Sequence, residues 1–452
     1  MYLAAKRIVS NLFYTMVVRL FIFILCALSS FPGLAQKSKK VPKPQVFVYG
    51  HGPDAFSAAM QAAQSGVETY WVVDSAHIGG PLIQGEAKHI QSNQGLDVGT
   101  WAFFLKGIAN VRQISDSALT AAKKNIAPRI AQNVFENSAD TIKRLAYKKN
   151  LTVTKIEKSG KGWQIVLNNG EKVKVKALVD ATPNASLLRL LKEKGVEPKL
   201  ALKDFDKKID YHSSLYRTGI AVAELDKQLF NIPLSNILPD STLQNYFATA
   251  TSDPLFPSGG ADHMPLLMLR AQACGAAAAY CAFFNTSADK INVRTLQGEL
   301  LAFKSFMIPF QDISLSDPHY PQIQRVGATG ILKGIYTESD AKGTFLFQPD
   351  SLVSSKEIEP IIKQLYTRSQ IWFKDKNIPV LKLKHLLDLI KYVANRGEEL
   401  NAEIEKGWTK RFKFEGEYNV EASLSRREFA VLVDTYLQPF HVRVNVKGEF
   451  QY

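Results

Sequence analysis

The sequence predicts an α/β protein with an inserted β-meander and a helical C-terminal region. Near residue 50, a short apolar strand leads into a glycine-containing turn, an alanine-rich helix and a second strand. Residues 151–175 alternate between apolar and polar side chains, as half-buried strands do. The last third of the chain carries one helix-start pattern twice, at Ser354 and Ser425. These three observations define the expected order of elements.

The composition is that of a folded globular protein. Of 452 residues, 46% are hydrophobic and 22% are charged, which excludes a disordered, collagen-like or disulfide-scaffold protein. A chain of this length is expected to form two or three domains. The formal net charge of +14 permits attraction to anions. However, the basic cluster at 143–176 is expected to be the solvent face of the meander rather than an anion-binding surface. It lacks interleaved aromatic residues, so no nucleic-acid partner is predicted.

The N-terminus has the order of a secretory signal peptide. Basic residues precede an apolar run from Leu20 to Leu28, and the small-residue site Gly33-Leu34-Ala35 follows. The run would span about 14 Å as a helix, against a hydrocarbon core of about 30 Å, so a membrane anchor is the weaker alternative. We therefore predict that residues 1–35 are removed and that 36–44 form a linker. The mature protein is predicted to be periplasmic or secreted, with no transmembrane span.

The unit that begins at Gln45 predicts a phosphate-binding turn. Residues 45–49 are apolar enough for a buried strand, and Gly50-His51-Gly52-Pro53-Asp54-Ala55 follows directly. A helix is expected from Ala55 to Ser65, with its alanines on one face. A second strand at 69–73 ends at Asp74. Strand, glycine turn, helix, strand and acid thus stand in the order of a dinucleotide site of Rossmann descent.

Each residue type in this unit has a physical role. Gly50 permits the tight turn, and Gly52 lets a pyrophosphate approach the backbone. The free N–H groups and the positive end of the helix dipole attract phosphate. The carboxylate of Asp74 would accept hydrogen bonds from a ribose.

Further landmarks follow along the chain in a fixed order. They are Gly79-Gly80, the meander at 151–180 that ends in Asp180-Ala181-Thr182, a strand at 243–248, and a Gly/Ala-rich helix from Pro265. Together with the glycine turn, this order resembles the FAD-dependent oxidoreductases of the glutathione-reductase-like fold, and more narrowly an exported bacterial subfamily. Stretches typical of that subfamily are Tyr216–Val222, Asn231–Leu234 and Arg325–Gly334.

The resemblance implies an FAD-dependent oxidoreductase that takes a hydride from a small organic substrate, with a saccharide as one candidate. FAD would place its pyrophosphate on the Gly50–Ala55 turn and its isoalloxazine near Ala248–Ala250 and the start of the Pro265 helix. The cofactor-binding residues implied in this way are Gly50, His51, Gly52, Pro53, Asp54, Ala55, Asp74, Gly79, Gly80, Ala181, Thr249 and Ala250. The resemblance identifies no catalytic side chain.

Several residues depart from the family pattern. Ala55 replaces the usual third glycine and is small enough to be tolerated, and Asp74 is shorter than the usual Glu. Asp54 places a carboxylate where a pyrophosphate should lie, Thr249-Ala250 replaces Ala-Gly, and Asp262 stands where a basic residue is common. The changes at Asp54, Thr249-Ala250 and Asp262 favour an alternative, in which a non-catalytic binding or structural protein uses a degenerate flavoprotein scaffold that has lost FAD.

Metal and thiol chemistry are not predicted. The eight histidines show no metal-ligand spacing with Cys or carboxylate clusters, so no metal is expected. Cys274 and Cys281 lie seven apart on one predicted helix, a separation of about 10.5 Å that is too long for a disulfide. Both are expected to be buried, unpaired thiols.

The C-terminal region, residues 317–452, is predicted to be helical with two capping boxes. In each copy an apolar residue precedes a Ser N-cap, and a Glu (Glu357 or Glu428) stands three residues later. The stretch 317–366 is similar to an S-layer-homology module, and the second copy keeps only the helix half. A structural cap is favoured over binding of a cell-wall polymer.

The predicted domain boundaries follow from these features. The oxidoreductase-like domain is expected at 45–316, with the dinucleotide-binding unit at 45–80, the meander at 151–180, a substrate-side segment at 200–245 and the last cofactor-side helix at 265–284.

Export can be tested directly. The basic start and the short apolar run predict a mature N-terminus at Gln36. N-terminal sequencing, or the intact mass of protein taken from the native envelope, would measure it. A full-length mass would contradict cleavage and export as a soluble protein.

Overall fold

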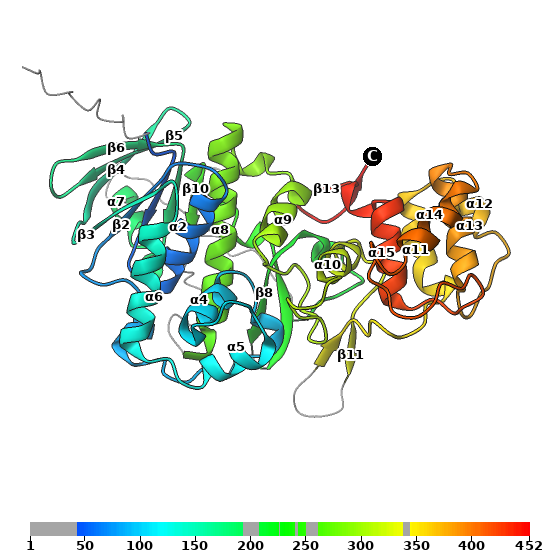
Figure 1. Ribbon diagram of the computed structural model, residues 1–452. Helices are drawn as coiled ribbons and strands as arrows, with labels where there is room; N and C mark the ends of the chain where they lie inside the picture. The colour runs from blue at the N-terminus through cyan, green and yellow to red at the C-terminus, as the bar shows by residue number, and fades with distance from the viewer. Residues whose placement is uncertain (1–42, 193–207, 226, 240–242, 250–260, 338–343) are drawn as a thin grey trace, which may run out of the picture. The chain divides into compact units, whose positions relative to one another are not determined.

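A five-stranded parallel sheet forms the centre of the computed structural model, which describes residues 43–192, 208–225, 227–239, 243–249, 261–337 and 344–452. The strand order is β10-β7-β1-β2-β3, and every neighbouring pair is parallel. The strands are β10 (Tyr246–Ala248), β7 (Ala177–Asp180), β1 (Val46–Tyr49), β2 (Thr69–Val73) and β3 (Leu145–Lys149). Figure 1 labels the strands β2, β3 and β10 of this sheet.

The strand sequences explain this sheet. All residues of β1, β2, β7 and β10 are buried, which is the pattern of a parallel sheet covered on both faces. β3 alternates between half-buried and exposed residues because it lies at the sheet's edge. The predicted strand before the last long helix is confirmed, although it begins at Tyr246 rather than at residue 243.

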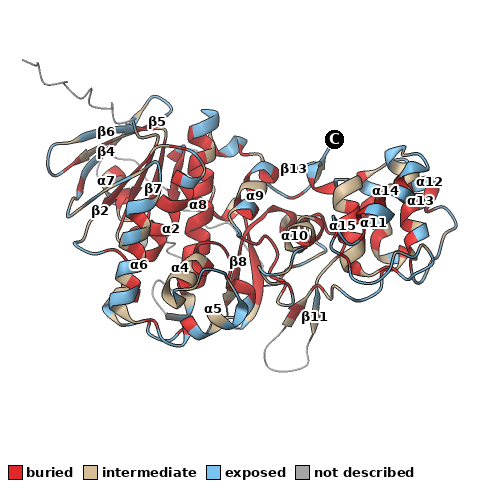
Figure 2. Cartoon of the chain, in the orientation of Figure 1, coloured by how far each residue is buried: buried red, intermediate tan, exposed pale blue. Residues whose placement is uncertain are grey.

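Two long helices cover one face of the sheet. α2 (Pro53–Gln64) and α8 (Met264–Phe284) pack against each other and are almost wholly buried (Figure 2). Gly275 makes this approach possible, because a Cβ there would lie 2.3 Å from the carbonyl oxygen of Ala58. The predicted alanine-faced helix is therefore confirmed, but it begins two residues earlier than expected, so Asp54 lies in its first turn.

The meander covers the other face. Its strands β4 (Val153–Ser159), β5 (Gly162–Leu167) and β6 (Lys172–Val175) are antiparallel. Trp163 and Ile165 belong to the same hydrophobic cluster as Phe47 and Tyr70 of the parallel sheet. The lysines at 155, 158, 172 and 174 are exposed. The expected solvent face of the meander is thus confirmed, although Lys148 and Lys149 belong to β3 instead.

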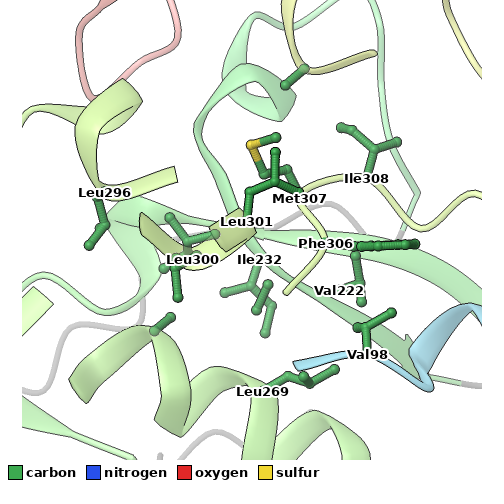
Figure 3. Packing of buried hydrophobic residues seen from close by; sticks show 14 of the residues in the cluster. Val98, Val222, Ile232, Leu269, Leu296, Leu300, Leu301, Phe306, Met307 and Ile308 are labelled. Atoms are coloured by element: carbon green, nitrogen blue, oxygen red, sulfur yellow. The ribbon is translucent and has the colours of Figure 1, made fainter. Parts of the chain in front are cut away.

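Further helices and two hairpins complete this part of the chain. They are α3 (Pro81–Gln84), α4 (Gly99–Ala109), α5 (Asp116–Lys123), α6 (Pro128–Thr141), α7 (Leu187–Lys192), α9 (Val293–Ala302), α10 (Tyr320–Thr329), and the hairpins β8 (Gly219–Leu225)–β9 (Gln228–Pro233) and β11 (Ile335–Thr337)–β12 (Thr344–Leu346). Of these, α4, α9 and β8 pack on α8. Figure 3 shows side chains of the shared core, in which Leu296 and Leu300 of α9 lie near Leu269 of α8 and Ile232 of β9. This packing fixes α9 in place.

Among the described helices, one, α8, is long and apolar enough to cross a bilayer, judged by its length and composition. However, 83% of its most apolar window is buried inside the protein. Its contacts with α2, β7 and β8 are those of a core helix.

The C-terminal helices are confirmed. They are α11 (Ser355–Leu365), α12 (Ser369–Trp372), α13 (Leu383–Ala394), α14 (Glu399–Gly407) and α15 (Arg426–Tyr436), followed by the hairpin β13 (Arg443–Val444)–β14 (Phe450–Gln451). Residues Pro44–Tyr452 form one compact unit. The similarity to an S-layer-homology module and the domain boundaries given above stay predictions. The predicted signal peptide and nearly all of the linker lie outside the described residues.

The repeated helix starts differ in one partner. Ser425 and Glu428 form a complete capping box, with Ser425 Oγ accepting the Glu428 N–H and the Glu428 carboxylate accepting the Ser425 N–H. Ser354 caps α11 in the same way, by accepting the Glu357 N–H at 3.3 Å. The Glu357 carboxylate instead pairs with Arg426 at the start of α15. The first copy is therefore an N-cap rather than a full capping box, because its Glu joins the two helix starts.

The two cysteines are unpaired and buried, as predicted. Burial raises the pKa of the Cys274 thiol to about 11 and that of Cys281 to about 12. Few thiolates form at neutral pH, so neither thiol should be reactive.

Ser425→Ala should lower the free energy of unfolding by about 1 kcal/mol, because it removes the N-cap hydrogen bond of α15. Ser354→Ala should act similarly on α11. Ser351→Ala is the matched control, since Ser351 is exposed, its hydroxyl makes one long hydrogen bond of 3.4 Å to Gln348, and its backbone contacts are unaffected by the substitution. Denaturant titration would measure all three, and equal stabilities would contradict the assigned helix starts.

Thiol labelling tests the packing of α8. Both thiols should react with an aromatic disulfide reagent only as fast as the native protein opens, and rapidly in denaturant. Rapid labelling of either cysteine in the native state would show that α8 is exposed.

Candidate functional site

The carboxyl ends of four strands meet at one edge of the parallel sheet. β1 leads into the Gly50–Ala55 turn, β2 into Asp74, β7 into Ala181 and β10 into Thr249. The chain order reverses at β1, which has β2 on one side and β7 on the other. In open α/β sheets, ligands bind at such a switch point, outside the carboxyl ends of the strands.

The backbone of the turn is held close to its neighbours. Gly50 has a φ of 137°, and a Cβ there would lie 2.3 Å from the carbonyl oxygen of Ala181, so no other residue fits without strain. The indole of Trp71 donates to the Gly50 carbonyl at 2.8 Å. The Gly79 N–H donates to the carbonyl of His51 at 2.8 Å. Gly79 is thus hydrogen-bonded to the turn and Gly80 lies beside Gly52, while a role of either glycine in cofactor binding stays a prediction.

Asp54 places a carboxyl group at the start of α2. The residue is buried, and Oδ1 lies against Gly52, where a Cβ would be only 2.2 Å away. Desolvation by burial raises the pKa of Asp54, while the hydroxyl of Thr249 and the backbone N–H groups of Asp54 and Ala55 oppose the rise. The carboxyl therefore lies beside the first N–H groups of α2, which a pyrophosphate would use.

Thr249 and Arg270 complete the surroundings of Asp54. Thr249 Oγ1 donates to Asp54 Oδ2 at 2.5 Å. The buried Arg270 guanidinium donates to the carbonyls of Ala248 and Thr249 at 2.8 and 2.5 Å, and to Asn236 Oδ1 at 3.0 Å. Its positive charge interacts with Asp54. Arg270 thus fixes the end of β10 and offsets part of the negative charge at the turn.

His51 lies beside Asp74, the residue predicted to bind a ribose. His51 Nδ1 lies 2.7 Å from Asp74 Oδ1, and both side chains are partly exposed. The hydrogen bond to Asp74 raises the pKa of His51, while burial opposes the rise. The carboxylate that would bind a ribose is therefore already paired within the protein.

The structure gathers the predicted site residues at this edge. Gly50, His51, Gly52, Pro53, Asp54, Ala55, Asp74, Gly79, Gly80, Ala181 and Thr249 all lie at the carboxyl ends of the strands or in the turns that follow them. Ala250 lies outside the described residues. The side chain of Asp262 contacts the segment after α3, and its Oδ1 accepts a hydrogen bond from the Gln91 N–H at 2.7 Å.

Sequence reasoning assigned no role to two buried groups. Arg270 is the single charged residue in the apolar helix α8, and this contrast could have indicated a functional role. Asp180 is also buried, which raises its pKa to about 6, and it accepts hydrogen bonds from Thr182 and from Tyr246 Oη at 2.6 Å. Only the pairing of β7 with β10 brings Tyr246 to Asp180, and no local pattern shows it.

The fold and the turn define a dinucleotide-binding unit of the Rossmann type. Residues 45–192 match the model of the family described as FAD dependent oxidoreductase. The matched segment contains the turn, Asp74 and the meander. This match supports an enzyme of the oxidoreductase class with FAD as its cofactor.

Solved structures show weaker similarity. A thioredoxin reductase from T. acidophilum is 19% identical over 31% of this chain and 36% of its own, with a TM-score of 0.20. OTEMO in complex with FAD and NADP is 20% identical over 31% and 26%, with a TM-score of 0.23. This chain therefore spans about a third or less of those proteins, and scores this low carry no argument. No curated protein matches the chain.

The residues present fit FAD in backbone geometry. The close approach at Gly50, the Cα of Gly52 without a side chain and the N-terminus of α2 form the cradle in which a Cβ would intrude. Two side chains stand within that cradle, because the Asp54 carboxyl lies against Gly52 and His51 is hydrogen-bonded to Asp74. FAD would have to displace the Asp54 carboxyl or bind beside its neutral form.

The His51–Asp74 pair predicts a pH-dependent stability. Because the folded-state pKa of His51 is raised, its contribution is full below about pH 6.5 and is lost as the pH rises through the raised pKa. His51→Gln should therefore lower Tm by about 1–2 °C more at acidic than at alkaline pH, a small effect because the pair is partly exposed. Paired thermal melts would measure it. Exposed His212→Gln is the control, and a Tm loss independent of pH would contradict the pairing.

Proposed function

We propose that the protein is an exported FAD-dependent oxidoreductase that oxidises a small organic substrate. The observation that carries this proposal is the Gly50–Ala55 turn at the switch point of the sheet, inside the segment that matches the family. The family match favours this function over a degenerate scaffold that has lost its cofactor. A saccharide is one candidate substrate class.

The residues of the turn would bind and orient the cofactor. The N-terminus of α2 would hold the pyrophosphate, and Asp74 would accept hydrogen bonds from the ribose once His51 moves aside. Ala248 and Thr249, held by Arg270, would border the ring system. FAD, when bound, would supply the acceptor for a hydride from the substrate.

Export is part of the same proposal and rests on the N-terminal sequence. A secreted or periplasmic enzyme would take its substrate outside the cytoplasm. The C-terminal helices would act as a structural cap, since α10 packs on α15 and the Arg325–Asp434 pair joins them at 2.7 Å. Binding of a cell-wall polymer is the less favoured role.

Asp54 should weaken FAD binding. Its carboxyl lies in the first turn of α2, beside N–H groups that the pyrophosphate needs, and as an anion it would repel the phosphates. Asp54→Ala is expected to tighten FAD binding about five- to thirtyfold, equivalent to ~1–2 kcal/mol. Flavin fluorescence titration of both proteins would measure it.

Two matched variants separate charge from bulk and from general effects. Asp54→Asn removes the charge and keeps the size, so it should recover much of the gain if repulsion dominates. Asp116→Ala makes the same charge change in the first turn of α5 and should leave FAD affinity unchanged. A wild-type protein that purifies with stoichiometric FAD would contradict competition by Asp54 and support the oxidoreductase. If no variant binds FAD, the proposed function itself fails.

A further inference from the structure

A second candidate site lies away from the glycine turn, between α9, α10 and α15. Here a cavity of about 750 Å³ is lined by residues of these three helices, by Arg411 after α14, and by residues of the segment from Gln438 to Arg443. Its volume is in the range of sites for small organic molecules. No residue of the Gly50–Ala55 turn lines it.

The charge of the cavity wall is strongly positive. Four arginines line it, at 294, 325, 411 and 443, against the single carboxylate of Asp434. Asp434 is bound by Arg325 through both carboxylate oxygens at 2.7 to 3.1 Å. Arg411 is paired with Glu403 at 3.0 Å, outside the wall. Two of the four arginines thus have carboxylate partners, and Arg294 and Arg443 have none among the described residues.

Arg294 is the unusual member, because it is only 6% exposed. Its Nη1 donates to Gln297 Oε1 at 2.9 Å, and the guanidinium stacks 4.7 Å from the ring of Phe440. Its Nη2 is buried without a hydrogen-bond partner in the part of the chain that the structure describes. Burial, together with the nearby Arg217, lowers the pKa of Arg294 to about 9. Because Nη2 has no contact with solvent, Arg294 acts on the cavity through its charge, and a buried cation is costly unless an anion lies nearby.

The helix that carries Arg294, α9, adds to the positive electrostatic potential of the cavity. The first turn of α9 contributes Asn292, Arg294 and Thr295 to the wall, so the positive end of its dipole lies at the cavity. The opposite side of α9 is anchored by Leu296 and Leu300 in the core (Figure 3). The donors are therefore held in place before any ligand arrives. Arg443, in contrast, is exposed and can close on a ligand.

We propose that this cavity binds a small organic molecule through its oxyanion groups, either a phosphate or a pair of carboxylates. The two arginines without carboxylate partners match a ligand that carries two negative charges. Guanidinium groups bind both kinds of oxyanion through paired N–H donors. The ring of Phe440 offers an apolar surface to the ligand's carbon skeleton.

Calorimetric titration of the full chain with inorganic phosphate and, separately, with citrate tests the site. At low ionic strength, at least one of the two should bind with a Kd below about 1 mM. Arg443→Gln should weaken that binding about tenfold, and its exposed position should leave folding intact. Arg294→Gln removes the buried charge behind the cavity wall, so it should weaken binding as well. Binding of phosphate alone or of citrate alone identifies the oxyanion, and either result supports the site.

Two controls keep this site distinct from the glycine turn. Arg129→Gln removes one exposed arginine from α6 and should leave anion binding unchanged. Asp54→Ala alters the turn and should also leave it unchanged. The proposal is overturned if neither anion binds, if Arg443→Gln and Arg129→Gln have equal affinities, or if only Asp54→Ala changes binding. None of these outcomes depends on whether the protein binds FAD.

Discussion

The contact of the Asp54 carboxyl with the start of α2 is the interaction on which the functional edge of the sheet depends. It joins three elements, because the carboxyl lies beside the first N–H groups of α2, accepts a hydrogen bond from Thr249 after β10, and lies against Gly52 after β1. The helix dipole stabilises the anion, and burial opposes it. The proposed phosphate-binding turn thus contains an acid of its own, and a dinucleotide bound there would have to compete with it.

How far the sequence predicts this site depends on how local each signal is. The glycine turn, Asp74 and the Ser N-caps were predictable, because their geometry is determined within a few residues. The strand β3 was not, because its lysines follow the basic pattern of the meander and only its pairing with β2 buries one side. The role of Arg270 was equally hidden. Its partners, Asn236, Ala248 and Thr249, are far from it along the chain and meet it only in the folded protein.

Long-range charge contacts also connect the C-terminal helices, α11 to α15, to the segments that precede them in the chain. Arg426 is buried, pairs with Glu357 and donates to the carbonyls of Phe347 and Lys333, so it ties the starts of α11 and α15 to the segment that contains β11 and β12. Arg325 and Asp434 join α10 to α15 in a second place. A carboxylate that a sequence pattern assigned to capping, Glu357, is used for this connection instead. The repeat therefore preserves the helix start and not the whole capping box.

The two buried arginines, Arg270 and Arg294, show how the same residue type serves different purposes. At Arg270, Nε and Nη1 donate to Asn236 Oδ1 and to the carbonyls of Ala248 and Thr249, and the charge of Asp54 lies nearby, so this cation is compensated within the fold. Arg294 has backbone carbonyls and Gln297 as partners and a second arginine close by, and within the described ranges it has no carboxylate partner and one donor unused. A cation needed only for packing could be replaced by an apolar side chain without this desolvation cost. The uncompensated charge is therefore better explained by a ligand that supplies the missing anion than by the stability of the fold.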